Sequence, residues 1–243
     1  MSASPSGDRV NPNRRQAWLA WSSGKDSLWA LHRARRFSDL EVSGLLTTIT
    51  ESYGRVTMHG VRESLVNAQA AALDLPLYTV RIPTPCSESE YESLMGGAMS
   101  EAAKAGVTSV IFGDIFLEDL RAHRARQLAR VGMDAVFPLW GIDTTTLAQT
   151  MIDQGVRAYV TCLDPQKAPR ALAGRSFDAE FLERLPEEVD PCGENGEFHT
   201  FVWEGPEFAA PLSVEVGETV EREGFMFTDL RACAVQPSVE VSR

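Results

Sequence analysis

The sequence predicts an α/β protein in which a parallel sheet carries helices on both faces, followed by a smaller α+β domain. Apolar runs alternate with helical stretches over the first 140 residues. Runs such as SVIFG are apolar throughout, as expected of parallel strands buried on both faces. After about residue 141 this alternation stops. We therefore expect a disordered lead-in (1–15), an α/β domain (16–141), a smaller domain (142–235) and a tail (236–243).

Local patterns place the elements of the first domain. Apolar runs predict strands at 17–21, 42–49, 77–82 and 108–115, and a short fifth strand at 134–140. Helices are expected at 27–35, 61–75, 90–105 and 117–131, where Pro76 closes the second helix and Gly106 the third. Ligands of parallel α/β sheets bind beyond the carboxyl ends of the strands. The residues that follow each strand are therefore the candidates for a site.

The smaller domain has a different texture. We expect helices at 144–154 and 178–185, and strands at 156–164, 212–218 and 224–230. Between them lies DPCGENGEFHTFVWEGP, residues 190–206, whose Gly-Asn turn is typical of the start of a strand.

Composition limits the function classes. With 44% hydrophobic and 23% charged residues, no long apolar run and no apolar core in MSASPSGDRVNPNRR, we expect a cytoplasmic globular protein without a membrane partner. The net charge of −11 argues against a nucleic-acid partner, although RAHRARQLAR (121–130) is either a solvated helix face or a functional basic patch. The four cysteines are widely spaced and contain no CxxC pair, so a zinc site has little support. A homo-oligomer is left open.

The turn SSGKDS, Ser22–Ser27, connects the first strand to the first helix. Gly24 lets the backbone approach a ligand, and Asp26 or Ser27 can cap the helix. The free N–H groups of the helix, the charge of Lys25 and the serine hydroxyls favour an anion. It is not a Walker A loop, because Leu19 stands where that loop needs glycine. The alternative is a tight strand-to-helix turn with an exposed lysine. The position of SSGKDS after the first parallel strand favours phosphate binding over this alternative.

Other candidates follow later strands. His59 lies after the second strand, Gly113 and Asp114 end the fourth, and His32 and His123 are expected to be structural or surface groups within helices. Glu118, Arg121 and Arg124 share roughly one helix face, where they pair with one another or grip a substrate carboxylate. GENGEFHT crowds Glu194, Asn195, Glu197 and His199 beside two glycines, either as a turn or as an acceptor site.

Three stretches together resemble a known family. SSGKDS resembles the SGGKDS signature of the PP-loop ATP pyrophosphatases, in the adenine nucleotide alpha hydrolase superfamily. Residues 113–140 and DPCGENGEFHTFV (190–202) resemble the diphthine–ammonia ligase (diphthamide synthase) family and its bacterial ATP-binding relatives. The resemblance covers the chain from residue 16 to about 230.

The resemblance implies a HUP-type nucleotide-binding domain and ATP cleaved between its α and β phosphates. A carboxylate becomes an adenylate, and ammonia or an amine displaces AMP to form an amide. ATP and Mg²⁺ are the implied ligands, bound by Ser22, Ser23, Gly24, Lys25, Asp26, Ser27, His59, Gly113 and Asp114. The implied acceptor residues are Glu118, Arg121, Arg124, Glu194 and Asn195.

Catalytic roles follow from these assignments. Lys25 would neutralise phosphate charge as it grows on the leaving pyrophosphate. Asp26 would cap the helix or hold Mg²⁺. A Glu197–His199 pair would orient the acceptor amine or take its proton near neutral pH.

The chain departs from the family pattern in specific places. Ser23 replaces the first glycine of SGGKDS, and Asn195 and His199 stand in GENGEFHT where relatives have GEGGEFET-like runs. We also expect no counterpart of the long C-terminal extension of eukaryotic members. Two alternatives remain open: a PP-loop tRNA-modifying enzyme, against which the charge and scattered thiols count, and a nucleotide-binding regulatory protein without turnover.

Overall fold

The structure is a computed structural model that describes residues 14–37 and 39–233. The predicted lead-in lies outside the described residues up to residue 13, and so does the predicted tail, 236–243. Strand β1 (Arg15–Ala20) begins at Arg15, the last residue that was assigned to the lead-in. No helix in the described ranges is both long and apolar enough to cross a membrane.

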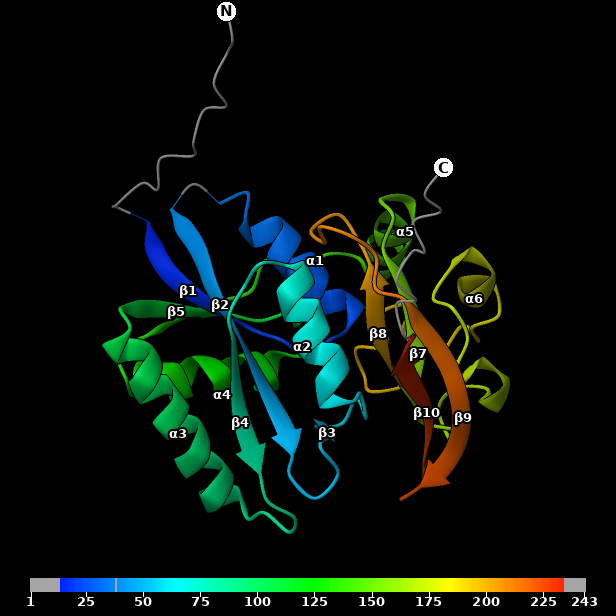
Figure 1. Cartoon of the computed structure of the whole chain (residues 1–243). Coiled ribbons are helices and arrows are strands. Elements are labelled where there is room, and N and C mark those ends of the chain that lie inside the picture. Colours follow the sequence, from blue (N-terminus) through cyan, green and yellow to red (C-terminus); the bar gives the residue numbers. More distant parts are fainter. Residues whose placement is uncertain (1–13, 38, 234–243) are drawn as a thin grey trace, which may run out of the picture.

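The first sheet has six strands and forms the left half of Figure 1. Parallel pairing runs in the order β4-β2-β1-β5-β6, and the short β3 pairs antiparallel with the end of β2. The strands after β1 are β2 (Leu40–Thr50), β3 (Arg55–Val56), β4 (Leu77–Ile82), β5 (Val107–Ile111) and β6 (Asp134–Val136). All carboxyl ends of the parallel strands therefore meet at one edge.

Helices cover both faces of this sheet, each with its own apolar core. One core joins α1 (Lys25–Ala34) and α2 (Glu63–Ala72) to the sheet and continues into the second half of the chain. The other joins α3 (Glu88–Lys104) and α4 (Glu118–Ala129) to the opposite face. Strand β1 contributes residues to both cores: Leu19 belongs to the first and Trp18 to the second.

The second half forms an antiparallel sheet of order β8-β7-β10-β9. Its elements are α5 (Thr144–Asp153), β7 (Arg157–Leu163), a 3₁₀ turn η1 (Arg170–Leu172), α6 (Ala179–Glu183), β8 (Phe198–Glu204), β9 (Val214–Arg222) and β10 (Phe225–Ala232). In Figure 1 this sheet stands beside the first, on the side of α1 and α2. The predicted fold class, a parallel α/β sheet followed by a smaller α+β part, is confirmed.

Several details of the first domain differ from the prediction. The predicted fifth strand, 134–140, ends at Val136. The fourth predicted strand, 108–115, ends at Ile111: the N–H of Phe112 still donates to Val136 of β6, but the N–H of Ile115 donates to Glu194. Strand β3 was not predicted, since two paired residues are too short to produce a periodic pattern.

Polar contacts fasten the two sheets together. Arg55 on β3 and Arg62, which forms a bridge with it, donate to Asp229 on β10 at 2.7–2.8 Å. His32 on α1 and Arg35 at its C-cap both pair with Glu207, which follows β8. The second sheet is thus held against α1 and against the end of β2, next to the strand ends where a ligand is expected.

Candidate functional site

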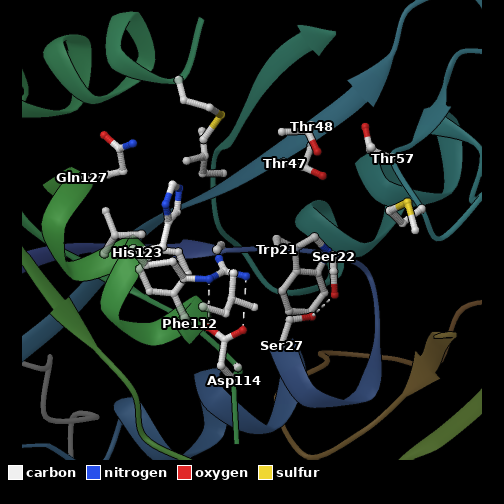
Figure 2. Close-up of a pocket in the computed structure, with 18 of the residues that line it drawn as sticks. Trp21, Ser22, Ser27, Thr47, Thr48, Thr57, Phe112, Asp114, His123 and Gln127 are labelled. Carbon is white, nitrogen blue, oxygen red and sulfur yellow. Dashed lines mark hydrogen bonds and ion pairs between the residues drawn. The ribbon is translucent and has the colours of Figure 1, made fainter. Parts of the chain in front are cut away.

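A cavity of about 1100 Å³ opens at the carboxyl ends of the parallel strands. Figure 2 shows Trp21, Ser22 and Ser27 on one side, with His123 and Gln127 on α4 on the other. Helix α3 and the segment 193–200 complete its walls. Elements from both sheets therefore enclose one space.

The SSGKDS turn presents only part of itself to this cavity. Ser22, Asp26 and Ser27 line it, whereas Ser23, Gly24 and Lys25 lie outside its lining. The Ser27 hydroxyl donates to the Gly24 carbonyl at 2.8 Å, which closes the first turn of α1.

The capping expectation for Asp26 and Ser27 is wrong. Gly24 is the N-cap of α1, and no side chain caps this helix within the described residues. The chain enters the helix at Lys25, so Asp26 and Ser27 already lie in its first turn.

Both residues that precede Lys25 are tightly constrained. Ser23 has a φ of +73°, in the left-handed region that favours glycine, and its hydroxyl is buried without a hydrogen-bond partner in the described part of the chain. A Cβ at Gly24 would lie 3.2 Å from both the His59 ring and the Thr200 carbonyl oxygen. The close approach that Gly24 permits is to the protein's own segments.

Lys25 is the largest departure from the expected geometry. Its side chain is 1% exposed and points toward the second half of the chain. Its Nζ donates to Asp26 Oδ2 at 2.9 Å and to the Cys192 carbonyl oxygen at 2.5 Å. In this conformation Lys25 is outside the cavity in which it was expected to meet phosphate.

The carboxylate that follows β5 lines the cavity and is paired with an arginine. Asp114 forms a two-point ion pair with Arg124, with contacts of 3.1 and 3.2 Å, marked by dashed lines in Figure 2. A Cβ at Gly113 would approach the backbone of Asp26 to 3.0–3.1 Å. Gly113 thus allows close packing of α1, whereas the sequence suggested close approach of the nucleotide.

The three residues expected to share one face of α4 separate in the structure. Arg124 lines the cavity, while Arg121 packs over the ring of Trp140 at 4.4 Å and Glu118 is exposed. Neither Arg121 nor Glu118 belongs to the described lining. His123, expected to be structural or a surface group, does line the cavity.

The GENGEFHT segment folds into a compact turn before β8. Glu194 lines the cavity, and its Oε1 accepts hydrogen bonds from the N–H groups of Ile115 at 2.7 Å and Phe116 at 3.4 Å. Asn195 also lines the cavity and donates to Glu197 Oε1 at 3.1 Å. A carboxylate from the second half of the chain is therefore fixed to the end of β5.

Family comparison agrees with this two-part site. Residues 15–135 match the diphthamide synthase N-terminal domain, and residues 143–240 match the diphthamide synthase C-terminal domain. The chain belongs to the diphthamide synthase family. The junction between the two matched regions lies between β6 and α5.

The chain is also similar to curated proteins, at low sequence identity. Diphthine–ammonia ligase of Bos taurus is 26% identical over 181 residues, covering 67% of this chain and 66% of that protein. The Homo sapiens protein of that name is 26% identical over 174 residues, covering 64% of each chain. The Danio rerio protein is 28% identical over 178 residues, covering 66% of this chain and 69% of that protein. The chain thus spans slightly less than two thirds of the bovine and human relatives.

In this family member, His199 does not pair with Glu197. Its ring lies 4.5 Å from the ring of His59, centroid to centroid, and both rings line the cavity. Within the described residues, Glu197 Oε1 instead accepts from the Asp190 N–H and from Asn195. The expected carboxylate–imidazole pair is therefore absent from this conformation.

The electrostatics of the histidine pair follow from burial. Burial, then the charge of Lys25, lowers the pKa of His199 to about 4. Burial also lowers the pKa of His59 well below its ordinary value, and its Nδ1–H donates to the Thr200 carbonyl oxygen at 3.2 Å. Both imidazoles are neutral near pH 7, so His199 is a weak base there, contrary to the expected proton transfer near neutrality.

Glu194 has the opposite electrostatic character. Burial, together with the charges of Asp26 and Asp114, raises its pKa to about 7 despite the N–H group of Ile115. This carboxyl group changes its charge near neutral pH at the edge of the cavity. It is a better candidate for proton transfer than His199.

Asp26 has one oxygen suited to Mg²⁺. Its Oδ1 is buried and has no hydrogen-bond partner among the described residues, while the side chain lines the cavity. Magnesium prefers one or two carboxylates together with phosphate oxygens and water. No three His, Cys, Asp or Glu side chains of the described ranges are arranged to hold a metal alone. Asp26 would therefore hold the ion jointly with phosphate.

Several constraining residues escaped sequence reasoning. The amide of Gln69 donates to the carbonyl oxygens of Ser23 and Val202, and its Oε1 accepts from the indole N–H of Trp21. Thr200 Oγ1 accepts the N–H of Lys25 at 3.1 Å. A polar residue in the apolar pattern of residues 61–75 was the available signal for Gln69; Thr200 carried none, because its partner lies 175 positions away.

Proposed function

We propose that this chain is an ATP-dependent ligase that forms amides and releases AMP and pyrophosphate. The observation that carries this proposal is that Ser22, Asp26 and Ser27 of the SSGKDS turn line the same cavity as residues of the segment 193–200. A nucleotide bound at the first segment would meet an acceptor bound at the second. The names of the curated relatives, diphthine–ammonia ligases, support the amide-forming class.

The phosphates would rest at the start of α1. The N–H groups of Asp26 and Ser27 lie in the first turn, where backbone donors and the helix dipole attract anions. The hydroxyls of Ser22 and Ser27 face the same cavity. Asp26 Oδ1 would hold Mg²⁺, which when bound neutralises charge on the phosphate oxygens.

The proposed chemistry needs two steps in one enclosed space. An oxygen of the acceptor carboxylate attacks the α-phosphorus, and pyrophosphate leaves with the electrons of the broken P–O bond. The nitrogen of ammonia or an amine then attacks the carbonyl carbon, AMP leaves, and the nitrogen loses a proton. Glu194 lies on the cavity wall and is suited to accept that proton.

The cavity has room for more than the nucleotide. Ligand pockets for one small molecule occupy roughly 300–1,000 Å³, and this one holds about 1100 Å³. Away from the turn Ser22–Ser27, the cavity is lined by Met99, Leu120 and Leu128, with His123 and Gln127 as polar groups. We place the carboxylate acceptor there, either a small molecule or a protein-bound group.

The test is product analysis with ATP labelled at the α-phosphate, in the presence of Mg²⁺, ammonium and cell extract. Label should appear in AMP, with pyrophosphate released. α,β-Methylene-ATP should inhibit without being cleaved, whereas β,γ-methylene-ATP should still yield AMP. Asp26→Asn should lower AMP formation at limiting Mg²⁺.

Other products would refute the proposal. Label in ADP would mean that the bond between the β and γ phosphates is cleaved. ATP binding without turnover in any extract fraction would favour a regulatory nucleotide-binding protein.

A further inference from the structure

The side chain of Lys25 points away from the cavity that its own turn lines. Its 1% exposure contrasts with the position of its neighbours Asp26 and Ser27 on the cavity wall. Nζ contacts the Cys192 carbonyl oxygen, in the segment that leads into GENGEFHT. The rings of Phe177 and Phe198 lie 5.3 and 5.2 Å from Nζ.

The ammonium group is satisfied where it lies. It has a carboxylate partner, a carbonyl partner and two aromatic faces, each of which stabilises a cation. Burial lowers the pKa of Lys25, but the charge and hydrogen bond of Asp26, together with the electrostatic effects of Cys192 and Asp190, outweigh it, so the pKa is raised and the side chain is cationic. Turning Nζ toward the cavity would leave Cys192 without this donor.

The contact with Lys25 also determines how Asp26 is presented. Asp26 Oδ2 accepts from Nζ at 2.9 Å, while Oδ1 is buried and without a hydrogen-bond partner in the described residues. A carboxylate fixed through one oxygen leaves the other with a defined direction. Lys25 thereby links the orientation of Asp26 to the backbone position of Cys192.

The backbone around Lys25 is joined to the second sheet as well. Its N–H donates to Thr200 Oγ1 at 3.1 Å, and the Ser23 carbonyl oxygen accepts from the Val202 N–H at 2.9 Å. Strand β8 therefore supports the turn through Thr200, which also lines the cavity, and through the backbone of Val202. Side chain and backbone attach the turn to the same part of the chain.

We propose that Lys25 is a positioning residue and does not bind phosphate. It fixes the orientation of Asp26 and connects the turn Ser22–Ser27 to the Cys192–Thr200 segment. This inference rests on the proposed function, because it assumes that a magnesium nucleotide occupies the cavity. Asp26 then meets Mg²⁺ through Oδ1, and Lys25 affects the nucleotide only through Asp26.

The first test uses the wild-type protein and an ATP derivative with a reactive acyl group on its terminal phosphate, which acylates lysines beside bound phosphates. The chain has only three lysines, Lys25, Lys104 and Lys167, so peptide mass spectrometry assigns any label. We expect no ATP-displaceable label on Lys25 in the folded protein, and labelling of all three lysines by a general amine reagent in denaturant. ATP-displaceable acylation of Lys25 would overturn the proposal.

The second test compares Lys25→Met with Asp26→Asn, using calorimetric binding of α,β-methylene-ATP. Methionine keeps the length of the side chain and suits the aromatic surroundings, and thermal unfolding checks that each variant folds. We expect affinity without Mg²⁺ to stay within about threefold of wild type in Lys25→Met, and the Mg²⁺ concentration for half-saturation to rise at least tenfold in both variants. The double variant should be no worse than either single one, because both act on one contact.

A direct phosphate contact gives the opposite pattern. Lys25→Met would then lose at least tenfold in Mg²⁺-free affinity, Asp26→Asn would not, and the two effects would add. If wild-type protein bound no nucleotide at all, the proposed function itself would fail. The two failures can be told apart. If the wild-type protein binds nucleotide, the effect of Lys25→Met on Mg²⁺-free affinity decides only the role of Lys25.

Discussion

Two helices wall the same cavity, and the chain holds them in very different ways. Eight of the ten residues of α1 are buried, and the helix packs against both sheets. Of the 17 residues of α3, only Met99 and Ala102 are buried. Its N-terminal half exposes Tyr91 at 42% and Leu94 at 37%, although Tyr91 lines the cavity.

The difference teaches which wall has a fixed shape. The α1 wall carries the turn Ser22–Ser27, where we propose that phosphate binds. Gln69 and Val202 donate hydrogen bonds to this turn and Thr200 accepts one from it, which holds the turn in place. The α3 wall contacts the apolar core of the sheet only through Met95, Ala98, Met99 and Ala102. A fixed wall suits the invariant part of a ligand, the phosphates, and a loosely held wall suits a variable part such as an acceptor.

Deleting core volume under the fixed wall should produce the largest effect. Leu28, on α1, is fully buried, so Leu28→Ala should lower the free energy of unfolding by about 3–4 kcal/mol through lost burial and a residual cavity. Urea unfolding followed by tryptophan fluorescence measures this change. The matched control is Leu94→Ala on α3, which should cost less than about 0.5 kcal/mol. Equal losses in the two variants would contradict the contrast between the walls.

Stiffening the loosely held wall should stabilise the protein. Gly96 and Gly97 lie in the middle of α3, and in the described structure nothing lies within 4 Å of a Cβ built on either. Each change to alanine should raise the free energy of unfolding by roughly 1 kcal/mol, because alanine favours helix over glycine. Thermal unfolding of the double variant measures the sum.

Gly113→Ala is the control on the fixed side. Its Cβ would approach the Asp26 backbone to 3.0 Å, so the same substitution should destabilise the protein and weaken nucleotide binding. A melting temperature that falls in Gly96→Ala/Gly97→Ala would show that α3 needs these glycines for packing.

Strain within the fixed wall predicts a smaller stabilisation. Ser23→Gly should raise the free energy of unfolding by about 1 kcal/mol, since it removes a Cβ at a φ of +73° and a buried hydroxyl without a described partner. Glu223→Gly is the matched control, with a φ of +52° and an exposed side chain. A larger gain at Ser23 than at Glu223 in chemical unfolding would isolate the hydroxyl contribution. An unstable Ser23→Gly protein would mean that the hydroxyl has a structural role.

Sequence reasoning was most successful where structure depends on local pattern. Apolar runs and helix-ending residues located the predicted strands and helices, and β4 was predicted with the bounds it has. The position of SSGKDS after β1 follows from the same strand-to-helix pattern.

Side-chain direction was not available from local pattern. Lys25 follows Gly24 in a turn that looks suited to an anion, but its partner is a carbonyl group 167 positions away. Likewise, helical spacing placed Glu118, Arg121 and Arg124 on one face, and only tertiary packing decided that Arg124 meets Asp114 while Arg121 meets Trp140. Contacts between distant segments determined these outcomes.

The smallest expected effect concerns the charge of Glu194, which lines the cavity from the segment before β8. The pKa of Glu194 is raised to about 7, chiefly by burial, so this carboxyl is neutral below that pH and anionic above it. A new negative charge beside the phosphate turn should weaken binding of α,β-methylene-ATP by about threefold between pH 6 and 8, at low salt. Calorimetric titration at several pH values measures the change.

Glu194→Gln isolates this effect, because the nucleotide's own protonation is common to both proteins. The ratio of wild-type to variant affinity should fall as the pH rises through 7. The same raised pKa affects folding: between the ordinary glutamate pKa near 4.3 and 7, the folded protein binds more protons than the unfolded chain. The stability that Glu194 contributes is therefore present at low pH and declines as the pH rises through this window, whereas Glu194→Gln removes that decline. A ratio independent of pH would show that the charge of Glu194 does not reach the bound phosphates, and would assign this carboxyl to the acceptor side of the cavity.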